Sequence, residues 1–250
     1  MFDEQTTKGG AERVLFVLAT LARLERSVSI SALVAETGLA QSTLYRQLAL
    51  LKRWGFVVDN NSEFMPGPMC VPLAWGFDRS SYLTQEAHSE LEQLSRSSGE
   101  SIGLLMAFNN QAVCLDMVES RQPLRCSFVK GRILPLCKGA SAKALLAFME
   151  KERRAAVFRY LVREKILSVE DIEQLEIELR AIVGRGFSTT DSEVDEGVWG
   201  VSAPVYQQGG NAVAVITLMA PNTRTRNRER FFIDMTVTVA SRISSRLQSL

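Results

Sequence analysis

The chain has 250 residues, of which 46% are hydrophobic and 23% are charged, and its formal net charge at pH 7 is +1. This composition is typical of a globular protein and excludes a disordered, collagen-like or low-complexity chain. No apolar run approaches the roughly 18 residues that a membrane span needs, and the polar first residues lack the apolar centre of a signal peptide. The four cysteines are far apart, so we expect reduced core thiols and a cytoplasmic protein without a membrane partner.

Helical spacing of apolar residues dominates the N-terminal part. A first helix is predicted between Arg13 and Arg23, because apolar side chains recur there on one side. A second, short helix follows, which Ser29 or Ser31 can cap and which Gly38 ends.

A third helix is predicted from about Gln41, with Leu44, Leu48 and Leu51 facing inward at spacing i, i+4, i+7. Two short helices joined by a tight turn with glycine form a helix-turn-helix unit. The N-terminal end of the second helix of such a unit reads base edges, so its polar side chains are candidate DNA contacts. These candidates are Gln41, Ser42, Thr43, Tyr45 and Arg46.

The charge distribution refines what the net charge indicates. A value of +1 argues against a nucleic-acid partner, yet residues 41–53 include Arg46, Lys52 and Arg53 and no acid. Phosphate binding depends on the local field, so a positive face can exist on a neutral domain. We expect Arg13, Lys52 and the segment after the third helix to contact phosphates. An ordinary solvated helix face is the alternative.

A β-hairpin is predicted after the third helix. Val57 and Val58 lead into a turn over residues 59–62, and Phe64 starts the return strand. Three helices followed by a hairpin predict a winged helix-turn-helix; a small helical subdomain that binds another protein is the alternative.

The composition predicts a domain boundary in the proline- and glycine-rich stretch 65–76. Pro66, Pro68 and Pro72 each remove a backbone donor, so no central strand or helix interior is expected to run through them.

Helices and strands mix in the rest of the chain. A helix is predicted over residues 83–98, and two apolar strands flank the turn at Asn109-Asn110. Ser168 and Asp171 form the capping box of a further helix that ends near Gly186. A strand over 212–219 and a last helix from about residue 227 complete the pattern, which predicts an α+β domain with an antiparallel sheet. The expected apolar face of the last helix is Ile233, Val237, Ala240, Ile243 and Leu247.

No catalytic arrangement is visible. His88 is the single histidine, and we expect it to be solvated or to cap a helix. No Ser/His/Asp or Cys/His pattern and no metal-ligand spacing occurs, so we expect no enzyme activity, metal or cofactor.

Residues 10–67 resemble the DNA-binding domain of the IclR family of bacterial transcription regulators. The resemblance is carried by Glu12-Arg13-Val14-Leu15, residues 37–48, Gly55-Phe56-Val57 and Phe64-Met65-Pro66-Gly67, although Ala40 replaces the usual proline and Gln41 a frequent lysine. Residues 131–147 and 185–221 extend the resemblance toward the C-terminus. It implies a winged helix-turn-helix domain over 1–67, a linker over 68–82 and a GAF-like α+β effector-binding domain over 83–250.

The resemblance also implies an effector pocket. Gly139, Ala140 and Ser141 open a helix whose first N–H groups can bind an anion, the alternative being that Ser141 caps its own helix. Gly200, Thr217 and Met219 stand where members that bind small keto acids carry a cysteine and two serines, so we expect an organic acid larger and less polar than glyoxylate. The expected effector-binding residues are Leu134, Gly139, Ala140, Ser141, Thr190, Asp191, Val198, Gly200, Thr217 and Met219.

The sequence therefore predicts a ligand-responsive transcription factor that binds double-stranded operator DNA sequence-specifically as a homodimer or homotetramer. Paired half-sites are expected because one module reads too few base pairs. The alternative is a cysteine-based redox or metal sensor on a GAF-like domain, since Cys114, Cys126 and Cys137 lie in the relevant region.

Overall fold

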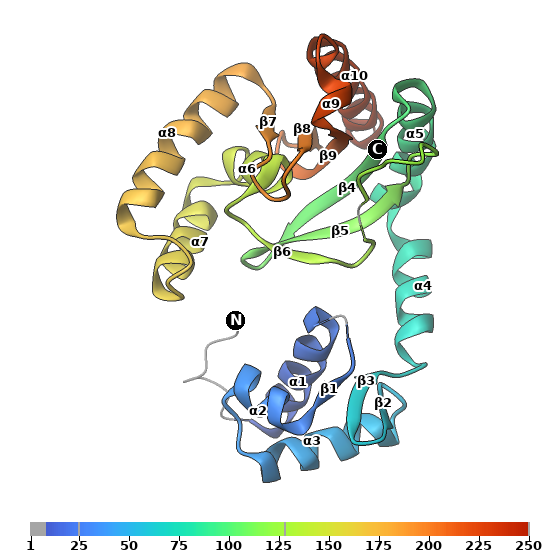
Figure 1. Ribbon diagram of the computed structural model, residues 1–250, viewed down its shortest axis with the longest axis vertical. Coiled ribbons are helices and arrows are strands. Elements are labelled where there is room, and N and C mark those ends of the chain that lie inside the picture. The colour runs from blue at the N-terminus through green and yellow to red at the C-terminus, as the bar shows by residue number, and fades with distance from the viewer. Residues whose placement is uncertain (1–8, 25, 128, 250) are drawn as a thin grey trace. The chain divides into compact units, whose positions relative to one another are not determined.

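The structure is a computed structural model that describes residues 9–24, 26–127 and 129–249 (Figure 1). Its internal contacts divide it into two units, Met1–Ser81 and Tyr82–Leu250. The expectation that the first residues form no signal peptide concerns residues 1–8, which lie outside the described residues.

The N-terminal unit contains the predicted helix-turn-helix. Ser29 caps the second helix, its hydroxyl accepting the N–H of Ala32 at 3.3 Å, and Gly38 ends that helix with φ 67°. The inward-facing leucines of the third helix, Leu44 and Leu48, are fully buried. The elements of this unit are α1 (Gly10–Leu24), β1 (Val28–Ser29), α2 (Ile30–Thr37), α3 (Gln41–Arg53), β2 (Val57–Asn60), β3 (Glu63–Pro66) and α4 (Cys70–Ser80).

The predicted hairpin is confirmed as β2 and β3. Its turn is tighter than expected, because β2 continues to Asn60 and only Asn61 and Ser62, with φ 52° and 66°, make the reversal. Left-handed residues at both turn positions match the right-handed twist of the flanking strands. A short strand that the sequence did not predict, β1, pairs with β3 and completes a three-stranded sheet. The winged helix-turn-helix is thus confirmed.

The segment after the wing, which the resemblance implies to be a linker, is helical. Helix α4 begins directly after Met69, and Pro72 is its third residue. A proline in the first turn is tolerated, because the N–H groups there have no partner within the helix. The prolines therefore exclude a helix interior, as predicted, but not a helix that starts at them. Val71, Leu73, Trp75 and Phe77 of α4 are all exposed.

The C-terminal unit is built on one antiparallel sheet with the strand order β6-β5-β4-β9-β8-β7. Helices lie on both faces of this sheet (Figure 1). The α+β class and the antiparallel sheet are confirmed. Its elements are α5 (Tyr82–Ser98), β4 (Ser101–Phe108), β5 (Gln111–Val118), β6 (Ile133–Pro135), α6 (Gly139–Ala147), α7 (Lys151–Arg163), α8 (Val169–Arg185), β7 (Ser188–Asp191), β8 (Val198–Tyr206), β9 (Ala212–Pro221), α9 (Asn222–Thr225) and α10 (Glu229–Gln248).

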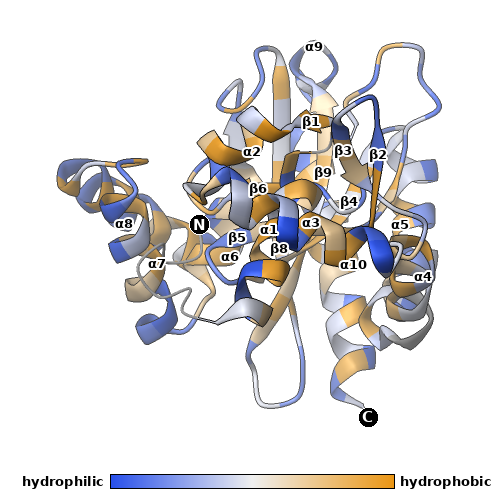
Figure 2. Ribbon diagram, turned by 90° about the horizontal axis from the view of Figure 1, so that it is seen from below, coloured by the Kyte–Doolittle hydropathy of each residue, from blue (hydrophilic) through white to orange (hydrophobic). Residues whose placement is uncertain are grey.

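Each face of the sheet carries its own hydrophobic core. Helices α5 and α10 pack on one face, and α6, α7 and α8 pack on the other. Figure 2 shows hydrophobic and hydrophilic stretches alternating along α8 and α10, as expected of helices with one buried side. None of the described helices is both long and apolar enough to cross a membrane.

Two predictions for the C-terminal helices can be compared with the structure, the capping box of α8 and the apolar face of α10. The capping box of α8 is confirmed, with the Ser168 hydroxyl accepting the Asp171 N–H at 3.1 Å and the Asp171 carboxylate accepting the Ser168 N–H at 2.9 Å. The predicted apolar face of α10 is partly wrong. Phe232 and Val239 are fully buried, whereas Ile233, Val237 and Leu247 are only partly buried, so the buried face is rotated from the predicted one.

Candidate functional site

The N-terminal end of α3 presents a polar surface. Gln41, Ser42, Tyr45 and Arg46 are exposed and Thr43 is partly exposed, whereas Gln47 is buried. Arg46 forms no ion pair with a described residue. Ala40, which precedes the helix, offers no side-chain acceptor, and its carbonyl accepts the Thr43 N–H at 2.9 Å, so the N–H groups of Gln41 and Ser42 remain for an incoming oxygen. The five residues predicted to contact DNA thus share one accessible surface.

The two predicted phosphate contacts differ in their surroundings. Lys52 Nζ donates to the carboxylate of Asp59 at 2.7 Å, which joins the end of α3 to the wing. This hydrogen bond is the main cause that lowers the pKa of Asp59, so the carboxylate stays charged at neutral pH. Arg13 lies on α1 and is partly buried. A phosphate bound by Lys52 would therefore compete with Asp59. The sequence did not predict the contact between Lys52 and Asp59.

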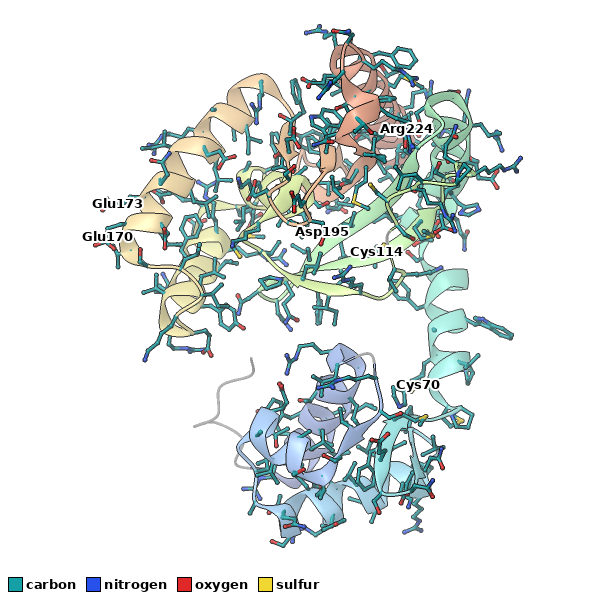
Figure 3. The ribbon with its side chains drawn as sticks, in the orientation of Figure 1. Cys70, Cys114, Glu170, Glu173, Asp195 and Arg224 are labelled. Atoms are coloured by element: carbon teal, nitrogen blue, oxygen red, sulfur yellow. The ribbon has the colours of Figure 1, made fainter. Side chains whose placement is uncertain are left out.

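The C-terminal unit contains a cavity of about 510 Å³ beside the N-terminal end of α6. Cys114 on β5 and Asp195 before β8, both labelled in Figure 3, line it from different elements. Nine of the ten residues expected to bind an effector also line it. These nine are Leu134, Gly139, Ala140, Ser141, Thr190, Val198, Gly200, Thr217 and Met219.

Asp191 is the exception. It does not line the cavity, and its carboxylate accepts hydrogen bonds from Ser192 at 2.8 Å and Asn222 at 3.4 Å. Successive side chains of a strand point to opposite faces, so Thr190 and Asp191 on β7 cannot both face the cavity. The structure thus does not support the expectation that Asp191 supplies an acidic group next to Thr190.

The N-terminal end of α6 is already occupied. The Gly139 N–H donates to the Glu193 carboxylate at 3.2 Å, and the Ala140 N–H donates to the Thr190 hydroxyl at 3.1 Å. Two of the N–H groups expected to bind an effector anion are therefore satisfied by side chains of the chain itself. Glu193, which sequence reasoning missed, is the carboxylate at this helix end.

Ser141 does not cap its own helix, which had been the alternative to anion binding at this helix end. Its hydroxyl lies 3.0 Å from the Thr217 hydroxyl, which in turn lies 2.5 Å from that of the buried Ser202. These three hydroxyls form a chain from the cavity into the interior. The Thr217 hydroxyl, with both neighbours bound, has little capacity left for a polar ligand.

Charged side chains from irregular segments complete the cavity lining. Arg125 pairs with Glu119 at 3.1 Å, whereas Arg132 and Lys138 form no ion pair with a described residue. Asp195 and Glu196 contribute acidic groups. These groups lie between β5 and β6, between β6 and α6, and between β7 and β8, in segments without a periodic pattern, which is why the sequence did not single them out.

The cysteines in this region are not poised for thiolate chemistry. Burial raises the pKa of Cys114 to about 12, and burial also raises the pKa values of Cys126 and Cys137. Among the described residues, no group of three or more His, Cys, Asp or Glu side chains could hold a metal ion.

His88 has a partner that the sequence did not reveal. Its Nδ1 lies 2.7 Å from the carboxylate of the buried Asp116, and Lys130 Nζ lies 3.7 Å from the same group. His88 is thus neither only solvated nor a helix cap. The thiol of the neighbouring Cys114 donates to the Asp116 carbonyl and not to His88, so these groups do not form a nucleophile–base pair.

Comparison with protein families matches both units. Residues 10–60 match the IclR helix-turn-helix domain, and residues 79–245 match the family model described as bacterial transcriptional regulator IclR C-terminal.

Curated relatives align over most of their length. The transcriptional repressor IclR of Escherichia coli is 26% identical over 243 residues, which cover 93% of this chain and 87% of that protein. The HTH-type transcriptional regulator Rv1719 of Mycobacterium tuberculosis is 30% identical over 234 residues, covering 91% and 89%. These relatives are named as regulators and repressors, in agreement with the expectation that the chain is not an enzyme.

Solved structures share the fold. An IclR family transcriptional regulator from Brucella abortus superposes with a TM-score of 0.82 at 19% identity, covering 98% of this chain and 95% of that chain. The IclR protein of Thermotoga maritima has a TM-score of 0.65 at 21% identity, covering 95% and 98%. With one family model matching the N-terminal helices and another matching two thirds of the chain, the protein belongs to the IclR family of bacterial transcriptional regulators.

Proposed function

We propose that this regulator binds operator DNA sequence-specifically through α3 and responds to an organic acid held in the C-terminal cavity. The observation that carries the proposal is the convergence of nine expected effector residues, from five elements, on one cavity of about 510 Å³. Ligand sites of drug-sized molecules occupy about 300–1,000 Å³, so the cavity suits a ligand much larger than a two-carbon acid.

The lining explains why the proposed effector is less polar than glyoxylate. Gly200 and Met219 offer no hydrogen-bond donor, and the Thr217 hydroxyl is held by two neighbours. Arg132 and Lys138 are the cations that an acid group can pair with, beside the acidic Asp195 and Glu196 in the same lining. An aromatic or longer aliphatic carboxylate combines the apolar surface and the single charge that this lining favours.

The effector proposal is tested by calorimetry on the full chain. We expect benzoate, used as the probe, to bind at least about tenfold more tightly than glyoxylate or pyruvate, because only the larger acid covers the apolar lining. Micromolar or tighter binding of glyoxylate or pyruvate would overturn the proposed effector class, since a small polar acid would then be the better fit.

The DNA-binding proposal is tested at Arg46. Its guanidinium is exposed and forms no ion pair with any of the described residues, and a bidentate contact from arginine to guanine is the commonest specific base contact. We expect Arg46→Ala to weaken binding to an operator selected from a random DNA library by about tenfold, measured by fluorescence anisotropy at fixed salt. Benzoate binding should be unchanged.

Arg23→Ala is the matched control for Arg46→Ala. Arg23 is also an exposed arginine of the N-terminal unit, but it lies on α1 and pairs with Glu36 at 2.7 Å. Its loss should change operator affinity by less than about twofold. Normal operator binding by Arg46→Ala would show that α3 does not recognise the operator through this residue.

We place the operator-bound protein in a homodimer or homotetramer. One helix-turn-helix contacts a half-site of a few base pairs, and two half-sites one helical turn apart supply the missing specificity. The effector would then act by binding two conformations of the assembly with unequal affinity. The cysteine-sensor alternative receives no support from the raised thiol pKa values.

A further inference from the structure

The segment between β7 and β8, residues 192–197, forms part of the cavity wall, and we refer to it as the strap. Four consecutive strap residues, Val194, Asp195, Glu196 and Gly197, line the cavity. The first three of these are exposed. The strap is therefore an exposed segment that borders the cavity.

The strap is closed on itself. The Ser192 N–H donates to the Val198 carbonyl at 2.8 Å, and the Gly197 N–H donates to the Ser192 hydroxyl at 3.1 Å. Ser192 and Gly197, at its two ends, have left-handed backbone conformations with φ 55° and 76°. Because its ends are joined, the strap can move as one piece about these two positions.

A single carboxylate fastens the strap to α6. Glu193 uses one oxygen to accept a hydrogen bond from the Gly139 N–H at 3.2 Å and the other to accept a hydrogen bond from Lys143 Nζ at 2.6 Å. Lys143 is 8% exposed and is also held by Glu178 on α8 at 2.9 Å. Both oxygens of Glu193 thus bind groups that are fixed by the core of the C-terminal unit.

The strap also packs closely on the same helix end. A Cβ atom built at Gly139 would lie only 2.8 Å from a Val194 methyl carbon, and Gly139 has φ 84°. Only glycine combines that backbone conformation with so close an approach. Glu193 and Val194 therefore hold the strap against the start of α6, whose first residues themselves line the cavity.

We propose that the strap is the gate of the effector cavity and that the contacts of Glu193 with Lys143 and Gly139 are its latch. This inference rests on the proposed function of the cavity as the effector site. An effector in the cavity touches both the strap and the helix to which the strap is latched, so movement of the strap changes access to the cavity. The latch thus sets how fast the ligand enters and leaves.

The proposal is tested by the accessibility of Cys114, which needs neither DNA nor effector. Cys114 lines the same cavity and is 3% exposed, so alkylation requires the cavity to open. In a full-length chain whose other three cysteines are serine, intact-protein mass spectrometry follows modification by N-ethylmaleimide. We expect Glu193→Gln to accelerate the reaction by about fivefold or more, because two charge-assisted hydrogen bonds are weakened.

Two further variants make the test decisive. Glu196→Gln removes the same charge from the strap, but Glu196 forms no ion pair with a described residue, so its rate should match that of the parent. Glu193→Asp keeps the charge on a side chain one methylene shorter and should give a smaller acceleration, which serves if Glu193→Gln does not fold.

Each outcome bears on the strap alone. A parent-like rate in every Glu193 variant that folds, or equal acceleration by Glu196→Gln, would overturn the gate. The effector proposal fails on a different measurement, the calorimetry of benzoate against glyoxylate, so the two can fail separately.

Discussion

Replacing Leu48 by alanine is expected to unfold the N-terminal unit while the C-terminal unit stays folded. Leu48 on α3 is 1% exposed and packs among the buried residues of α1, α2, α3 and the wing. Truncating a buried leucine to alanine costs about 3 kcal/mol, through lost burial and the cavity left behind. A unit of this size has a total stability of only about 3–5 kcal/mol, so one such loss removes most of it.

The independence of the two units follows from their cores. The hydrophobic residues around Leu48 all belong to the N-terminal unit, and the two cores of the C-terminal unit lie on its own sheet. Denaturation followed by circular dichroism should therefore show one lost or weakened transition and one unchanged transition. Operator binding should be lost, and benzoate binding in calorimetry should be retained.

Leu50→Ala is the matched control for this prediction. Leu50 lies two residues further along α3 but is 41% exposed, so its truncation should change the free energy of unfolding by less than about 0.5 kcal/mol. If Leu48→Ala bound operator DNA like the parent chain, the wing and the three helices would have a core that does not depend on this leucine.

Elements whose residues carry a strong local signal could be predicted from the sequence. The leucines of α3, the capping box of α8 and the hairpin at Asn109-Asn110 each carry a local signal, and each lies where it was expected. Local signals suffice there because capping, turn geometry and helical spacing act over fewer than about eight residues.

Predictions failed where a local pattern permits more than one structure. Phe232 and Ile233 are adjacent apolar residues of α10, so helical spacing alone fits two neighbouring faces, and packing on the sheet selects the face with Phe232. Pro72 was correctly excluded from a helix interior, but the same residue is compatible with the first turn of α4.

The contacts that shape the cavity could not be predicted from the sequence. The residues taken from the family resemblance converge on it, yet the contacts that shape it join residues far apart in the chain. Glu193 binds Lys143 across 50 positions, and Asp116 binds His88 across 28. Nothing in the spacing of either pair predicts a contact, since the sheet register and helix packing bring them together.

Replacing Arg224 by methionine is expected to destabilise the C-terminal unit by about 3 kcal/mol. Arg224, labelled on α9 in Figure 3, donates from Nε and Nη2 to both oxygens of Glu100, at 2.7 and 2.6 Å. The Glu100 side chain is only 2% exposed, and its hydrogen bond with Arg224 raises the pKa of the guanidinium. Removing the cation leaves a buried carboxylate without its counter-charge, which costs about 3–5 kcal/mol.

Two comparison variants separate the buried charge from other causes. Arg230→Met removes an exposed arginine of α10 whose partner Asp234 is also exposed, and such pairs contribute about 0–1 kcal/mol, so little change is expected. Glu100→Gln combined with Arg224→Met should recover part of the lost stability, because the uncompensated charge is gone. Urea denaturation measures the free energy of unfolding of Arg224→Met, Arg230→Met and the double variant. An Arg224→Met variant as stable as Arg230→Met would contradict the prediction.

The same substitution connects stability to the cavity. Arg224 Nη1 also donates to the Leu124 carbonyl at 2.8 Å, and Leu124 lines the cavity from the segment between β5 and β6. Arg224→Met therefore releases one wall of the cavity while the latch of the strap on the other segment stays intact. We expect benzoate affinity to fall in Arg224→Met at temperatures where the unit is still folded. Lysine at position 224 should restore only part of it, because an ammonium cannot bind both Glu100 oxygens and the carbonyl in the planar geometry of a guanidinium.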